Sequence, residues 1–151
     1  MQTTEPVASR NLPSGLVSDA LSAHHREIED ACQAIMSAAF ADEPRDLTLR
    51  WRVIERELLA HMATEEEQLL PAFQRTDPEN AQWLRDDHAR LREQALELGV
   101  SIQLHSVRAE QLQGFVDALR AHAAREEASL YPWAATLERD HRRRQLHASG
   151  E

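Results

Sequence analysis

Two copies of one short pattern are the part of this sequence best suited to chemistry. His61 and Glu65 lie four residues apart, and so do His122 and Glu126. Residues four apart share one face of a helix, one turn above each other. Four pairs of residues are each separated by 61 positions: His61 and His122, Glu65 and Glu126, Glu66 and Glu127, Pro71 and Pro132. One such pair could occur in any helix, but the repeat predicts a duplicated metal-binding half-site.

Two further histidines, His25 and His88, interrupt otherwise apolar helical stripes. A single histidine in such a stripe is more often a core residue with a hydrogen-bond partner. Four histidines and two glutamates at one level would be very costly to bury without compensation. Metal ions would offset that cost, because they bring positive charge to the carboxylates and accept the imidazole lone pairs.

Four amphipathic helices must position these residues. We expect them at about residues 16–40, 47–74, 78–99 and 107–139, where apolar residues recur every three or four positions. Asp77-Pro78 is typical of a helix cap followed by proline in the first turn. Short connections between such helices imply an all-α fold, an up-down-up-down four-helix bundle.

Helix geometry also predicts how far along the bundle axis each of these polar residues lies. His25 and His61 each lie about 18 residues from the first connection, which is roughly 27 Å at 1.5 Å per residue. His88 and His122 bracket the third connection in the same way. We therefore expect six side chains to converge in one layer as metal ligands: His25, His61, Glu65, His88, His122 and Glu126.

The ligand types narrow the choice of metal. Imidazole and carboxylate without thiolate suit iron, manganese or zinc. Six ligands are too many for one tetrahedral zinc ion. Carboxylates from two opposed helices could bridge two ions, and helical bundles build dinuclear carboxylate sites of this kind.

The combined pattern resembles the hemerythrin-like HHE cation-binding domain over about residues 16–137. It is carried by His25-Arg-Glu-Ile, His61-x-x-x-Glu65-Glu66 with Leu70-Pro71, His88-Ala-Arg-Leu, and His122-x-x-x-Glu126-Glu127 with Tyr131-Pro132. The resemblance implies a non-haem di-iron centre of two Fe ions, with Glu65 and Glu126 as bridges and the histidines as terminal ligands. Mn or Zn could take the place of iron.

Two positions depart from the oxygen-carrying members of that family. Those proteins have a second histidine one turn along the third helix, where this sequence has Arg92. They also have an aspartate five residues after the last histidine, where this sequence has Glu127, and Glu126 is the better match. The resemblance is therefore to the His-x-x-x-Glu variety of the family.

Several neighbours of the six residues have less certain roles. His24 could be a fifth histidine ligand or could support one, although a half-exposed residue at the rim is the simpler interpretation. Glu66 and Glu127 suit solvated partners of ligand imidazoles, with direct ligation as an alternative, and Asp87 could orient His88. We expect Cys32 to lie in the core. The three tryptophans and Tyr131 are expected to pack in the core or at its rim, and His105, His141 and His147 to lie at the surface.

Length and charge limit the other possibilities. The 151 residues suit one domain, at 14–140, with a disordered lead-in at 1–13 and a flexible polar tail at 141–151. The net charge of −9 argues against nucleic-acid binding. There is no apolar run of roughly 20 residues and no signal-peptide pattern, and there is one cysteine, so we expect a cytoplasmic protein without a membrane anchor.

Three functions fit these observations. The first is a di-iron protein that binds or senses oxygen, nitric oxide or peroxide, or handles iron. The second is a di-iron enzyme with peroxidase, catalase-like or oxidase activity. The third is a metal-free helical interaction module, for which His61→Ala and His122→Ala would leave stability unchanged or raised. The sequence names no protein partner and leaves monomer and homodimer open.

Overall fold

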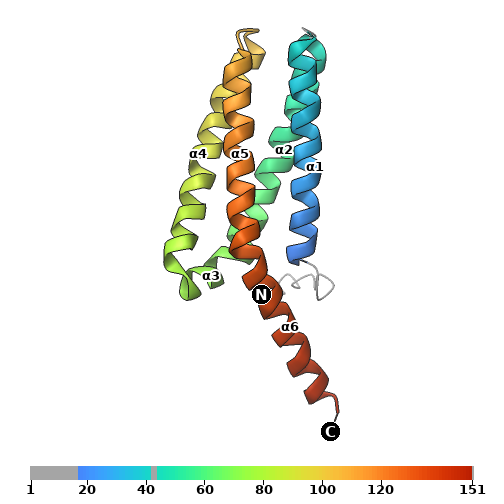
Figure 1. Cartoon of the computed structure of the whole chain (residues 1–151), viewed down its shortest axis with the longest axis vertical. Helices are drawn as coiled ribbons and strands as arrows, with labels where there is room; N and C mark the ends of the chain where they lie inside the picture. The colour runs from blue at the N-terminus through green and yellow to red at the C-terminus, as the bar shows by residue number, and fades with distance from the viewer. Residues whose placement is uncertain (1–16, 42–43, 151) are drawn as a thin grey trace, which may run out of the picture.

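The computed structural model describes residues 17–41 and 44–150, and the fold over these residues is all-helical, as predicted (Figure 1). The helices are α1 (Val17–Phe40), α2 (Pro44–Gln68), α3 (Leu70–Thr76), α4 (Pro78–Gln103), α5 (Ala109–Ala128) and α6 (Leu130–Ala148). Figure 1 shows α1, α2, α4 and α5 running side by side along the long axis. The short α3 lies at one end, and α6 extends beyond the others.

Two of the four predicted helices are each divided in two. The second is broken at Leu69, between α2 and α3, and the fourth is broken at Ser129, between α5 and α6. Pro71 and Pro132 follow within three residues, in the first turn of the new helices. Proline is tolerated there because backbone N–H groups in a first turn have no partner within the helix. Pro71, which falls inside the helix expected over 47–74, thus lies just after a break in that helix.

Other helix ends agree with the sequence in part. The Asp77 carboxylate accepts a hydrogen bond from the Asn80 backbone at 3.2 Å, which confirms the predicted cap of α4. α4 ends at Gln103 rather than near Gly99, and α6 reaches Ala148 rather than about Arg139. The flexible tail stays a prediction, and the lead-in at 1–13 lies outside the described residues.

The polar layer divides the apolar core into two clusters. On α1 the two clusters lie on either side of His25, with Leu21 in one and Ile28 in the other. The same change of cluster occurs between Leu84 and Leu91 on α4, from α2 into α3, and from α5 into α6. The six predicted ligands therefore lie in one cross-section of the molecule with packed hydrocarbon above and below it.

Among the described residues, no helix is both long enough and apolar enough to cross a membrane.

Candidate metal centre

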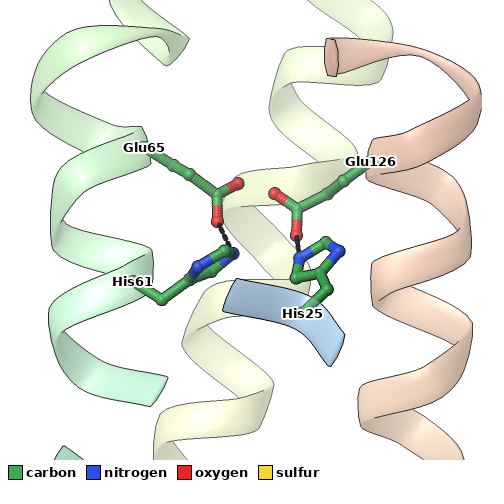
Figure 2. A group of neighbouring side chains, drawn as sticks. All are labelled: His25, His61, Glu65 and Glu126. Carbon is green, nitrogen blue, oxygen red and sulfur yellow. Dashed lines mark ion pairs between the residues drawn. The ribbon is translucent and has the colours of Figure 1, made fainter. Parts of the chain in front are cut away.

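The structure brings all six predicted ligands together, in two overlapping groups. One group is His25, His61, Glu65 and Glu126, and the other is Glu65, His88, His122 and Glu126. Within each group, one ligand atom per residue lies within 4.8 Å of every other. Figure 2 shows the first group, with the Glu65 and Glu126 carboxylates facing each other across the space between α2 and α5. Because both groups contain both glutamates, each carboxylate is placed to serve two ions.

The two shared carboxylates are buried without hydrogen bonds. Glu65 and Glu126 are both 0% exposed, and none of their four carboxylate oxygens has a hydrogen-bond partner among the described residues. The ring nitrogens of His61 and His122 lie 2.6 and 2.8 Å from these oxygens, but without the geometry of a hydrogen bond. Buried polar atoms are otherwise almost always paired. Two cations between these groups would satisfy them, so the residues fit a dinuclear metal centre.

Each ligand imidazole has an outer partner at its Nδ1 atom. The distances are 3.3 Å from His25 to Glu127, 3.0 Å from His61 to His24, 2.9 Å from His88 to Glu66, and 3.1 Å from His122 to Asp87. A partner on one ring nitrogen fixes the orientation of the ring and leaves the other nitrogen available for a metal. In all four rings, Nε2 is therefore the nitrogen that faces the two groups of converging side chains. The predicted supporting role of Glu66 and Glu127 agrees with this arrangement.

Arginines hold two of these outer carboxylates in place. Arg92 donates to both oxygens of Glu66 at 2.7 Å, and this ion pair lowers the pKa of Glu66 to about 2. Arg125 donates to Asp87 at 2.8 Å, and Arg90 also pairs with Asp87. Arg92 stands where the oxygen-carrying members have a second histidine. Here it holds Glu66, the partner of His88, in position.

Two of the uncertain neighbours are now placed. His24 lies behind His61, with Nδ1 3.0 Å from Nδ1 of His61 and Nε2 2.8 Å from Glu57, which is the position of a supporting residue. The prediction that Asp87 orients His88 is wrong, because Asp87 contacts His122. Adjacent helical residues point about 100° apart. When His88 faces the centre, Asp87 therefore faces the neighbouring α5.

Sequence reasoning assigned Tyr131 to packing and missed a contact with the centre. The side chain is buried, but its hydroxyl oxygen lies 2.9 Å from Nε2 of His25 and 3.1 Å from Nε2 of His61. Nine residues of one continuous helix would place it opposite His122. The break at Ser129 changes the direction of the chain before Tyr131, so the register of α5 does not apply.

The other residues set aside by the sequence behave mostly as expected. Cys32 is 1% exposed in the core, and His105, His141 and His147 are exposed. Trp51 is buried, whereas Trp83 is 60% exposed and lies outside the core.

A cavity of about 230 Å³ reaches the centre from the surface between α1, α2 and α5. Three of the six converging residues line it: His25, His61 and His122. Its apolar wall includes Ile28, Leu58 and Leu119, and Arg120 also lines it, paired with Glu29 at 2.6 Å. The volume is below the roughly 300–1,000 Å³ of pockets for drug-sized ligands, so the cavity suits small molecules.

Burial of the histidines predicts an acid-sensitive metal-free state. Desolvation lowers the pKa of His61 to about 4 and that of His122 to about 3, below the value of about 6.5 for an unfolded chain. The unfolded chain then binds more protons, so stability falls as the pH falls from about 6.5 toward 4. Urea unfolding of the metal-free protein across this range tests the slope, and a midpoint independent of pH would contradict it.

The Glu126→Gln variant is the control for this dependence of stability on pH. Burial raises the pKa of Glu126, so its protonation favours the folded state as the pH falls and opposes the histidines. The Glu126→Gln variant removes this opposing group. As the pH falls, we expect the urea unfolding midpoint of this variant to decrease more steeply than the midpoint of the unchanged chain.

The outer carboxylates should matter for metal affinity. Replacing Asp87 with asparagine removes the negative charge beside His122 and leaves Arg125 unpaired. We expect metal affinity to fall about 10–100-fold, the usual effect of losing such a partner. Competition with a chelator of known affinity measures it, with Asp86→Asn on the exposed face of α4 as the matched control. Equal affinities in the two variants would contradict the assigned role.

Comparison with known families agrees with this geometry. No curated protein and no solved structure matches the chain. The family model of the hemerythrin HHE cation binding domain matches residues 16–134, most of the chain and all six of the converging side chains. The protein therefore belongs to the hemerythrin HHE cation-binding family.

Proposed function

We propose that this protein holds a non-haem di-iron centre and uses it to bind or sense a small ligand such as oxygen, nitric oxide or peroxide, or to handle iron. The observation that carries the proposal is the pair of overlapping ligand groups sharing two buried, unpaired carboxylates. Iron accepts this mixture of imidazole and carboxylate, and bound to it would supply redox chemistry and Lewis acidity. The proposal includes the family's up-down four-helix arrangement, built from α1, α2, α4 and α5.

The number of protein ligands leaves room for an external one. Four histidines and two bridging carboxylates do not fill the positions of two six-coordinate ions. The protein orients the imidazoles through their Nδ1 partners, and burial excludes water from the two carboxylates. The free positions would then be open to a ligand arriving through the cavity.

The cavity favours a diatomic molecule or peroxide over an organic substrate. Its walls are largely apolar and its volume is about 230 Å³. A neutral diatomic molecule loses little hydration on entering such a space, whereas a polar organic substrate would lose hydrogen bonds without replacement. This supports small-ligand binding as the first candidate function.

Spectroscopic titration tests the proposal. Iron-loaded protein is treated with azide in the ferric state and with nitric oxide in the ferrous state, and the absorption bands are followed as each ligand is added and removed. We expect saturable, reversible changes. Continuous consumption of hydrogen peroxide by the same sample would instead identify the enzymatic alternative. No response to any of the three would contradict the binding of small ligands and leave iron handling as the function.

Narrowing the cavity should slow ligand access without changing the centre. Ala123 lines the cavity one residue after His122, and phenylalanine there would extend into the space. We expect Ala123→Phe to bind azide more slowly at unchanged iron content, measured by stopped-flow absorption. Ala128→Phe, at an exposed position of α5 away from the cavity lining, is the control. Equal rates in the two variants would show that ligands enter elsewhere.

A further inference from the structure

The centre has an internal two-fold pattern in its ligands. His25 and His88 are 63 positions apart, and His61 and His122 are 61 apart, as are Glu65 and Glu126. Each of the two ligand groups takes one histidine from each pair and shares the two glutamates. The two metal positions are therefore equivalent as far as these six residues are concerned.

The outer partners of the imidazoles follow the same pattern. Glu127 lies beside His25 as Glu66 lies beside His88, and the two glutamates are 61 positions apart. His24 lies beside His61 as Asp87 lies beside His122, and these two are 63 positions apart. The correspondence thus extends beyond the ligands, which makes any departure from it informative.

Tyr131 is such a departure. Its counterpart, 61 positions earlier, is Leu70, a fully buried apolar residue with no group that could bind a metal. The Tyr131 hydroxyl instead lies within 3.1 Å of Nε2 on both His25 and His61, the two histidines of the same ligand group. One metal position therefore has a polar oxygen beside it that the other lacks.

The spacing of that oxygen matches a shared metal ion. With metal–ligand bonds of about 2.1 Å, adjacent ligands at right angles around an ion are about 3 Å apart. The hydroxyl oxygen is 2.9 and 3.1 Å from the two nitrogens that the imidazoles leave for the metal. An oxygen at these distances from both nitrogens has the spacing of a neighbouring ligand on the same ion.

We propose that the phenol oxygen of Tyr131 is a further protein ligand of the ion held by His25, His61, Glu65 and Glu126. The inference rests on the proposed dinuclear function. A metal–oxygen bond replaces the phenol O–H bond, and the proton is released to solvent. The two ions are then inequivalent, with five protein ligands on one and four on the other. The ion held by His88 and His122 then keeps more positions open to an external ligand than the ion beside Tyr131.

The composition of the chain makes the proposal directly testable, because Tyr131 is its only tyrosine. A tyrosinate bound to ferric iron gives a visible charge-transfer band and characteristic phenolate vibrations in resonance Raman spectra. We expect both signals in the ferric-loaded protein, and we expect the vibrations to shift when the protein contains ring-deuterated tyrosine. Tyr131→Phe should abolish both signals, while Trp133→Phe on the same helix should keep them.

The possible outcomes separate this inference from the proposed function. Two bound irons without phenolate signals in the unchanged protein would overturn the role of Tyr131 and leave the di-iron centre standing. Absence of bound iron would overturn both. Since the isotope shift is measured on the unchanged protein, the result does not depend on Tyr131→Phe folding or retaining iron.

Discussion

Replacing Glu65 with glutamine is expected to remove both metal ions rather than one. Glu65 belongs to both ligand groups, and its two carboxylate oxygens have no other partner among the described residues. A neutral amide keeps the shape of the side chain but removes a negative charge facing two cations. We expect iron content to fall from about two ions per chain, the count of a dinuclear carboxylate site, to below one. Metal analysis after gel filtration measures it.

In the metal-free protein, the same substitution should not lower the free energy of unfolding. Glu65 and Glu126 bring two carboxylates close together in a dry layer, where burial of charge without a partner is destabilising. Without metal, Glu65→Gln should therefore be at least as stable as the unchanged chain. Glu67→Gln, two residues away and exposed, is the matched control for both measurements. Loss of stability without metal, together with unchanged iron content, would contradict the assigned role of Glu65.

Removing the metal is expected to lower the melting temperature strongly. A ligand that binds only the folded state at about 1,000 times its dissociation constant contributes about 4 kcal/mol, which is about 8–16 °C for a chain of this size. Without metal, the buried carboxylate oxygens and the Nε2 atoms of His88 and His122 have no partner among the described residues. Circular dichroism melts of loaded and chelator-treated protein in one buffer measure the difference.

The histidine variants identify the origin of that difference. His61→Ala and His122→Ala should melt close to the chelator-treated protein and should respond little to added iron. His141→Ala, an exposed residue on α6, should melt like the unchanged chain. If the melting temperature is the same with and without metal, and His61→Ala is neutral or stabilising, the metal-free interaction module is the better account.

The sequence was sufficient to predict the helical class and the meeting of six side chains. The repeat at 61 positions and the rise per residue place His25, His61, His88 and His122 at one level, and the structure has them there. These features depend only on helix geometry and on the alternation of apolar residues, which are local properties.

The sequence could not predict the features that depend on changes in helix direction and on contacts between helices. The breaks at Leu69 and Ser129 reset the register of the chain, which is why Tyr131 reaches the centre against its helical phase. Asp87 was paired with its neighbour His88, but its partner His122 lies on another helix. Similarly, the match between Arg92 and Glu66 requires knowing that α2 and α4 are adjacent. A repeat analysis of the outer residues, rather than of the ligands alone, would have matched Asp87 with His24 and Glu66 with Glu127.

The most direct test of the central claim is the metal content of the protein purified without chelator, with an absorption spectrum of the same sample in air. The account predicts about two irons per chain, with near-ultraviolet bands of a bridged ferric pair that change when azide is added. Failure to take up metal, even after refolding with ferrous iron without oxygen, would contradict it. The six side chains would then form a buried polar network that serves the fold alone.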